Sequence, residues 1–232
     1  MVFNSIFFIF CFLPVFMLIY YLVPGKLRNL LLFLGSLIFY AWGEPVYVIL
    51  MLFSSVFNYY MGAELERLYY DDRKQKINLI FSIIVNLGIL VFFKYYGFLL
   101  NTIGGITGIH IPHPELSLPI GLSFYTFRNL SYLFDIYLSK VNAQRNFLTF
   151  AVYSTMFPYT SAGPIVRYAD IEEQLDKRTI NISKFGTGAE LFVKGLAKKV
   201  ILADNLSALQ SFPDVCIHCL DWYPCLYHAA LF

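Results

Sequence analysis

The end of the 232-residue sequence holds its densest group of reactive side chains. Residues 215–232 read VCIHCLDWYPCLYHAALF and include Cys216, His218, Cys219, Cys225 and His228. Thiolate and imidazole groups are preferred zinc ligands, and a Cys-x2-Cys pair can also exchange disulfides. The spacing favours neither chemistry: only five residues separate the two ligand pairs, whereas zinc loops usually separate them by about 12 or more. No strand and helix pattern typical of thioredoxin surrounds the cysteines either.

Two charged side chains inside an apolar stretch are the next candidates. Arg128 and Asp135 lie in LPIGLSFYTFRNLSYLFDIYL, residues 118–138. A charge at the centre of a bilayer costs at least ~2.5 kcal/mol, so such residues tend to mark function. They lie on one helix face two turns apart, too far for a direct pair, and each is expected to face a wet cavity or a partner elsewhere. The alternative is that Asp135 lies near the cytoplasmic interface and that Arg128 snorkels or packs structurally.

Two histidines, His110 and His113, lie in the Gly- and Pro-rich stretch NTIGGITGIHIPHPELS. A pair of loop histidines without acidic or cysteine neighbours is more typical of solvated surface than of a metal or catalytic site. We therefore predict no metal site in this chain.

The elements that must position these residues are membrane helices. Hydrophobic residues make up 58% of the chain and charged residues only 14%, against roughly 45–50% and about 25% in soluble domains. Several uncharged runs approach the ~20 residues of a transmembrane helix: 1–25, 29–43, 45–63, 77–93, 95–114, 116–127 and 146–166. The composition predicts an all-α, polytopic transmembrane helix bundle, because the runs are too long and unalternating for barrel strands.

The first run lacks a basic start and a cleavage site, so we interpret it as a retained span. The net charge of +2 is too small and dispersed to indicate nucleic acid.

Basic residues order the crossings. They follow the first run (Lys26, Arg28), occur in ELERLYYDDRKQK at 64–76 and return at Lys140 and Arg145. The positive-inside rule places these connections in the cytoplasm, and five successive crossings then agree in parity.

The next apolar run, residues 146–166, breaks that parity. A sixth crossing would place Arg167 and the basic residues after it outside. Pro158, Gly163 and Pro164 would also interrupt a helix here. We therefore predict a re-entrant segment open to the cytoplasm, since broken backbone at membrane depth must be buried in protein or line a wet cavity.

Residues 186–209 interleave apolar residues with Lys194, Lys198 and Lys199. The lysines at i and i+4 share one face, which is typical of an interfacial amphipathic helix. A helix docked in the bundle with its lysines in the cytosol is the alternative.

Several motifs of the chain resemble the membrane-bound O-acyltransferase (MBOAT) family, in its bacterial alginate O-acetylase-like branch. They are PIGLSFYTF (119–127), QRN (144–146), FP (157–158) and GPIVRY (163–168). Similar stretches extend the resemblance from residue 2 to about residue 205.

The resemblance implies a multi-helix enzyme that takes an acyl group, here acetyl, from a cytoplasmic donor such as acetyl-CoA or an acyl carrier. The resemblance implies that this group passes through a tunnel toward an extracytoplasmic polysaccharide. Periplasmic or extracellular proteins would be partners in the transfer, and membrane lipid would surround the enzyme. The location would be the inner (cytoplasmic) membrane, multi-pass. Arg128, Asp135, Gly163, Pro164 and Arg167 are the candidate tunnel or motif residues. D-alanyl transfer to teichoic acid is the alternative within the family; a non-enzymatic membrane subunit or a small transporter is the alternative outside it.

The family's catalytic histidine belongs to a tryptophan- and arginine-rich stretch that this chain lacks, so we assign no catalytic residue. The resemblance ends where the cysteine-rich tail begins. Permitted codons for residues 216–232, read one base later, can encode the apolar sequence VFTVWIGILAYIMLHYF. We therefore interpret residues 1–206 as the N-terminal part of an acyltransferase and residues 207–232 as an atypical tail, out of frame, and expect the product to be inactive alone.

Overall fold

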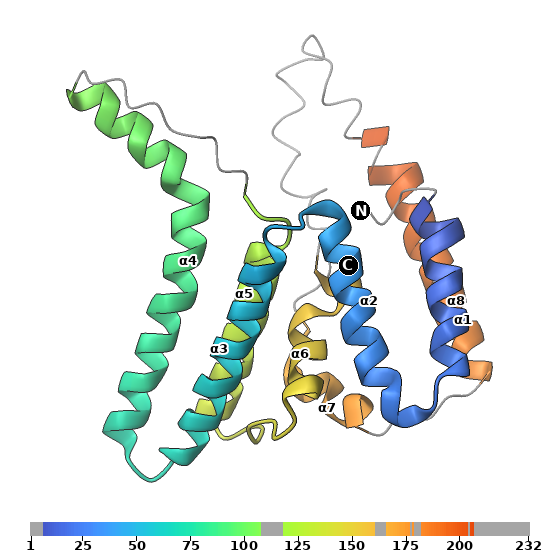
Figure 1. Ribbon diagram of the computed structural model, residues 1–232, viewed down its shortest axis with the longest axis horizontal. Helices are drawn as coiled ribbons and strands as arrows, with labels where there is room; N and C mark the ends of the chain where they lie inside the picture. The colour runs from blue at the N-terminus through green and yellow to red at the C-terminus, as the bar shows by residue number, and fades with distance from the viewer. Residues whose placement is uncertain are drawn as a thin grey trace. The chain divides into compact units, whose positions relative to one another are not determined.

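The computed structural model describes residues 7–107, 118–160, 166–176, 178, 182–203 and 205–206. In this part of the chain every regular element is a helix, and eight of them are α-helices (Figure 1). The chain divides into two compact units, Met1–Arg178 and Thr179–Phe232. The first unit contains α1 to α7 and the second contains α8. Because every regular element is a helix, the all-helical prediction is confirmed for the described residues.

The first unit has this order: the π-helical turn η1 (Phe8–Phe12), α1 (Leu13–Leu22), the 3-10 turn η2 (Gly25–Leu27), α2 (Arg28–Gly43), α3 (Val48–Arg67), α4 (Asp72–Thr107), α5 (Leu122–Tyr137), α6 (Phe147–Thr155), the 3-10 turn η3 (Phe157–Tyr159) and α7 (Tyr168–Asp176). The second unit contributes α8 (Ile182–Ala197) and the π-helical turn η4 (Lys198–Ala203).

Two helices are long and apolar enough to cross a membrane by length and composition: α3, and α4 over Asp72–Leu100. The helical stretch Phe8–Leu22 is apolar but shorter. Helices α2 and α5 have 16 residues each, which gives about 24 Å at 1.5 Å per residue against a hydrocarbon core of about 30 Å. Two candidate membrane helices are thus present, and the full set of five crossings stays a prediction.

Helix α4 begins well before its apolar run because a polar first turn stabilises its start. Asp71 precedes the helix, and its Oδ1 accepts a hydrogen bond from the backbone N of Lys74 at 3.2 Å. Its other carboxylate oxygen lies 2.8 Å from Lys74 Nζ. The hydrogen bond from the Lys74 side chain is the main cause that holds the pKa of Asp71 below its usual range.

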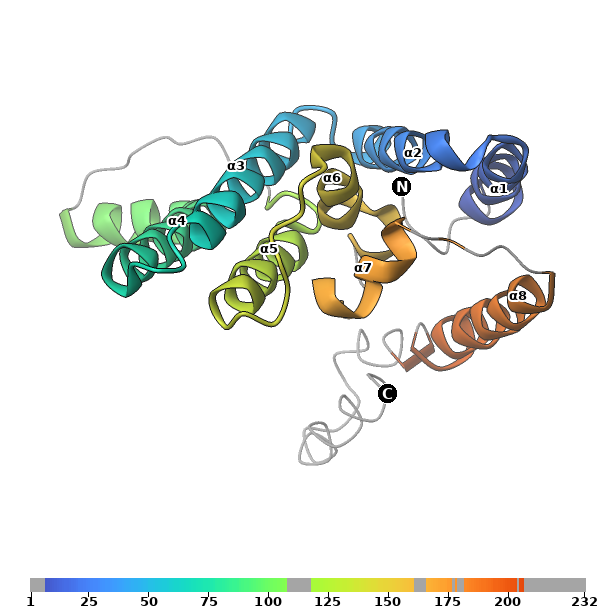
Figure 2. The same ribbon diagram turned by 90° about the horizontal axis from the view of Figure 1, so that it is seen from below.

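Small residues let the central helices of the first unit approach one another closely. Helix α3 packs against both α4 and α5, and α6 packs against α2 and α3 (Figures 1 and 2). At Gly62 on α3, a Cβ would lie 2.7 Å from Cε1 of Tyr132 on α5. Glycine at such a contact allows close helix packing, as is common between membrane helices.

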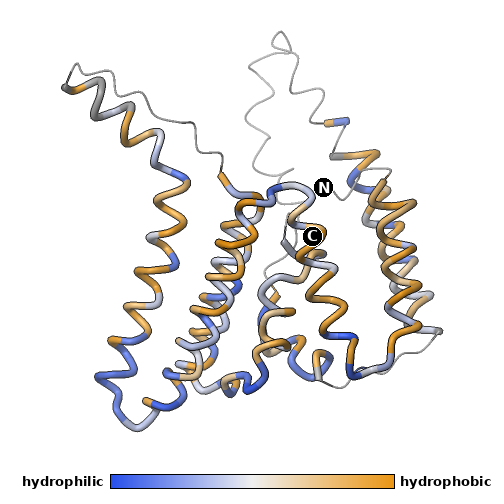
Figure 3. Tube along the Cα trace, in the orientation of Figure 1, coloured by the Kyte–Doolittle hydropathy of each residue, from blue (hydrophilic) through white to orange (hydrophobic). Residues whose placement is uncertain are grey.

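The connections of the first unit alternate between its two ends. The α1–α2, α3–α4 and α5–α6 connections lie at one end, where hydrophilic residues gather (Figure 3). The α2–α3 connection lies at the other end beside the start of α5, where Glu44 Oε2 accepts from the backbone N of Ile120 at 2.8 Å. This alternation agrees with the order of crossings predicted from the basic residues.

The described part of the second unit is helical and has exposed apolar side chains. Leu191 and Val193 on α8 are 64% and 61% exposed. On the same helix Lys194 pairs with Glu190 at 2.6 Å, one turn away. The predicted helix is therefore confirmed, and its interfacial placement stays a prediction.

Candidate functional site

The predicted interruption of residues 146–166 is present as a break between α6 and η3. Helix α6 ends at Thr155, and Met156 leaves the helical conformation with φ −50° and ψ 117°. Pro158 follows in η3; proline has no backbone N–H and restricts the residue before it, so a regular helix cannot continue through this point. The end of α6 is dry, with Tyr153 and Ser154 at most 1% exposed. The carbonyl groups that the break releases must therefore find partners within the protein.

Arg128 of α5 supplies those partners. Its Nη1 donates to the backbone oxygens of Tyr153 and Ser154 at 2.9 and 3.3 Å, and its Nη2 donates to the backbone oxygen of Tyr159. The side chain is 1% exposed. A positive charge at the C-terminal end of a helix is also favoured by the helix dipole. The partner that the sequence leaves unnamed for Arg128 is thus the backbone on both sides of the break.

Two further contacts, one from the start of α5 and one from α2, hold the chain around η3. Gly121 precedes α5 with φ 76°, a left-handed conformation that favours glycine. A Cβ at this position would lie 2.1 Å from the backbone oxygen of Thr160. From α2, Ser36 Oγ accepts from the backbone N of Phe157 at 3.1 Å. The chain around η3 is therefore fixed from α2 and from the start of α5.

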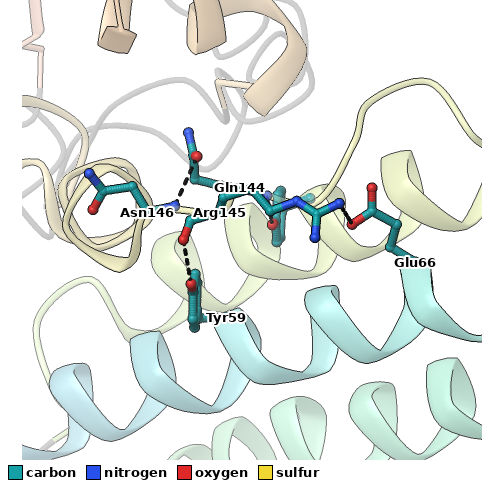
Figure 4. A network of polar contacts seen from close by, with 6 residues as sticks. Tyr59, Glu66, Gln144, Arg145 and Asn146 are labelled. Carbon is teal, nitrogen blue, oxygen red and sulfur yellow. Dashed lines mark hydrogen bonds and ion pairs between the residues drawn. The ribbon is translucent and has the colours of Figure 1, made fainter.

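The base of α6 is tied to α3 by residues 144–146 (Figure 4). Tyr59 donates to the backbone oxygen of Arg145 at 2.8 Å, and Arg145 pairs with Glu66 at 3.1 Å. Asn146 caps α6 by accepting from the backbone N of Leu148 at 2.9 Å.

The same residues tie α6 to α7. Gln144 Nε2 donates to Tyr168 Oη at 2.8 Å, so the start of α6 and the start of α7 lie side by side. Tyr153 Oη lies 3.1 Å from the backbone oxygen of Val166, just before α7. These two bonds join the start of α7 to the start of α6 and to Tyr153 near its end.

The remaining candidate residues lie apart from the break or outside the described part of the chain. Asp135 is 6% exposed, and its Oδ2 has no hydrogen-bond partner among the described residues. Arg167 is exposed just before α7, where its backbone oxygen accepts from Asp170 N at 3.2 Å. Gly163 and Pro164 lie outside the described residues, as do both loop histidines and the tail of residues 207–232. No group of three or more His, Cys, Asp or Glu residues that could hold a metal occurs in the described part of the chain.

The chain is similar to curated O-acetylases over most of its length. It is 38% identical to the probable alginate O-acetylase AlgI of Pseudomonas aeruginosa over 213 residues, which is 90% of this chain and 41% of that protein. AlgI of Azotobacter vinelandii is 37% identical, with 90% and 43% covered. The peptidoglycan O-acetyltransferase of Helicobacter pylori is 32% identical, with 91% and 46% covered.

This chain is a homologue of the AlgI O-acetylases. It spans about two fifths of the length of the AlgI proteins that it matches. No family model matches the chain, and no solved structure does. In this AlgI homologue the motifs of residues 119–127 and 157–158 meet at the helix break, and the motif of residues 144–146 lies at the other end of α6.

Sequence reasoning missed a polar network in the AlgI homologue that joins α3, α4 and α5. Asn58 and Asn86 exchange side-chain hydrogen bonds at 3.0 and 2.9 Å, each donating to the other's Oδ1. Asn129 Nδ2 donates to Ser54 Oγ at 3.2 Å. All four side chains are buried. The signal available in the sequence was an amide side chain within each apolar run, since polar residues inside a membrane bundle pair with one another.

Proposed function

We propose that this chain forms the N-terminal part of a membrane O-acyltransferase that moves an acetyl group from a cytoplasmic donor toward an extracytoplasmic polysaccharide. The observation that carries the proposal is the 38% identity to the P. aeruginosa alginate O-acetylase over 90% of the chain. The donor would be acetyl-CoA or an acyl carrier, and the acceptor an alginate-like polymer. The protein would lie in the inner membrane as a multi-pass protein, with periplasmic or extracellular proteins as partners.

In this proposal residues 146–166 form a re-entrant segment beside the path of the acyl group. Helix α6 has nine residues, about 13.5 Å at 1.5 Å per residue, which is less than half of a hydrocarbon core of about 30 Å. The hydrogen bond between Gln144 and Tyr168 supports a return of the chain to the side on which α6 begins. Arg128 would keep the break rigid, because it donates to backbone oxygens on both sides of it.

The acceptor separates the candidate reactions. The H. pylori relative supports peptidoglycan as a second acceptor for acetyl transfer. D-alanyl transfer to teichoic acid is a further alternative within the same chemistry, and the names of the matched relatives favour acetyl. A non-enzymatic membrane subunit or a small transporter would share the fold without transferring any acyl group.

A chimera tests the proposal. Residues 1–206 would replace the matching part of P. aeruginosa AlgI, in a strain that lacks its own AlgI. We expect acetyl esters on the alginate of this strain, because the chain then supplies the segment in which it resembles AlgI. Peptidoglycan acetyl esters and teichoic acid D-alanyl esters, measured on purified polymers with the chimera as catalyst, separate the three acceptors.

Two controls complete the test. Residues 1–232 expressed alone are expected to give no esters, because the histidine-bearing stretch that the resemblance makes catalytic is not among them. Unmodified AlgI sets the upper limit. A chimera that inserts into the membrane at the level of AlgI and yields no ester on any of the three polymers contradicts the proposal.

A further inference from the structure

A basic pocket lies in the first unit, away from the helix break. Its volume is about 470 Å³. It is formed by the α1–α2 connection, the start of α6 and the end of α7, and its polar lining includes Lys26, Arg28, Asn29, Asn146, Thr149 and Arg178. The α1–α2 connection lies more than 100 positions from the other two segments in the sequence. The fold thus gathers three cationic side chains around one cavity.

The described lining of this pocket contains no carboxylate to balance the three cations. Arg28 Nε and Arg178 Nη2 are buried and have no hydrogen-bond partner among the described residues. A buried donor without a partner costs about 1–3 kcal/mol, and more when it is charged. The pocket therefore gathers three positive charges with no opposite charge in its described lining, which favours the binding of an anion.

Other contacts hold the two guanidinium groups in place. Arg178 Nε donates to the backbone oxygen of Gln174 at 2.9 Å, and its Nη1 donates to Tyr20 Oη at 3.3 Å. The Arg28 guanidinium lies 5.6 Å from the centre of the Tyr20 ring. The two guanidinium groups are therefore oriented before any ligand arrives, which lowers the entropic cost of binding.

The start of α6 adds further attraction for an anion. Asn146 caps this helix, and Thr149 lies in its first turn. Asn29 Nδ2 lies 3.3 Å from both Thr149 Oγ1 and the backbone oxygen of Leu175, which joins α2, α6 and α7 around the pocket. The N-terminal end of a helix carries partial positive charge, and fixed guanidinium groups match the geometry of phosphate oxygens.

We propose that this pocket binds a phosphate group at the cytoplasmic end of the bundle. The phosphate has two sources: the soluble acyl donor, as in coenzyme A or a phosphopantetheine arm, or the headgroup of an anionic phospholipid. Only the first source rests on the proposed acyl-transfer function. The binding site itself rests on the three cations and on the contacts that hold Arg28 and Arg178.

Binding by the purified 232-residue chain in dodecyl maltoside, a detergent without phosphate, tests the pocket. Coenzyme A is titrated by calorimetry, and phosphatidylglycerol is titrated by native mass spectrometry, with uncharged diacylglycerol as the reference lipid. We expect the double variant Arg28→Gln/Arg178→Gln to weaken binding of the phosphate ligand at least tenfold, which is about 1.4 kcal/mol. The matched pair Arg73→Gln/Lys140→Gln removes the same charge from exposed positions outside the pocket and is expected to change the affinity less than twofold.

The outcomes separate the two sources. Coenzyme A binding that is lost in the pocket variant identifies the soluble donor, and binding of phosphatidylglycerol alone identifies the lipid. Absence of both, or equal weakening by the two variant pairs, overturns the proposal. If the pocket variant does not fold, Lys26→Gln, an exposed lining residue, serves in its place with an expected loss of about threefold. Phosphate binding together with an inactive AlgI chimera would contradict the proposed function and leave the pocket standing.

Discussion

Replacing Arg128 with methionine should destabilise the helix break more than any other single loss of charge in the described bundle. Methionine keeps the length and flexibility of the side chain but cannot donate to the backbone. The three carbonyl oxygens that Arg128 serves, those of Tyr153, Ser154 and Tyr159, would lose their donor. Because the Arg128 side chain is only 1% exposed, water does not readily reach these oxygens to donate in its place.

The size of the effect follows from two opposing contributions. A hydrogen bond to a charged group contributes about 1.5–3 kcal/mol, so the loss of the three bonds costs roughly 4.5–9 kcal/mol. Removing a charge from membrane depth returns about 2.5 kcal/mol. We therefore expect Arg128→Met to lower the free energy of unfolding by roughly 2–6.5 kcal/mol. Arg128→Lys keeps the charge but lacks the planar fork that spans the break, so it should also destabilise.

Unfolding in mixed micelles with increasing dodecyl sulfate gives the free energy, and hydrogen exchange of residues 150–160 shows where stability is lost. Arg167→Met is the matched control, because Arg167 is an exposed arginine just before α7. Its effect should stay within about 0.5 kcal/mol, as for most surface substitutions. If Arg128→Met is as stable as Arg167→Met and residues 150–160 keep their exchange protection, Arg128 does not hold the break.

Two further substitutions test the packing around the site. Gly121→Ala should lower stability by at least about 1–2 kcal/mol, which is the cost of a left-handed conformation for a residue with a Cβ. The new Cβ would also lie 2.1 Å from the backbone oxygen of Thr160, which adds to that cost. Gly25→Ala, where no atom lies within 4 Å of the new Cβ, is the control in the same thermal melt. A double-mutant cycle with Asn58→Leu and Asn86→Leu should give a coupling energy of about 0.6–1.7 kcal/mol, from the average to the maximum measured for hydrogen bonds between membrane helices. Additive effects of the two leucines would show that the amide pair contributes no stability of its own.

Apolar runs and proline positions predicted much of the backbone. The uncharged run at 29–43 corresponds closely to α2, Arg28–Gly43. The proline at 158 marks the end of α6 within three residues. The start of α4 was harder to predict, because its first turn is polar and is stabilised by Asp71 rather than by burial. Hydropathy shows where apolar faces lie and gives no information on such local capping.

The partners of the polar side chains could not be predicted in the same way. Arg128 was recognisable as a costly charge in an apolar run. Its partners are backbone carbonyls of another helix, and they are free to accept from Arg128 only because that helix breaks beside it. The basic pocket could not be predicted from the sequence for a related reason. Lys26, Arg28 and Arg178 looked like separate cytoplasmic charges, and only the packing of α2, α6 and α7 brings them around one cavity.

Acetyl esters on alginate from the AlgI chimera are the most direct measurement of the proposed function. Proton NMR of the purified polymer gives the number of acetyl groups per sugar residue, normalised to the amount of chimera in the membrane. We predict acetylation above the AlgI-deficient background, together with a loss of acetylation when Arg128→Met is introduced into the chimera. Alginate that stays without acetyl groups while the chimera is inserted at the level of AlgI would contradict the assignment of this chain to alginate acetylation.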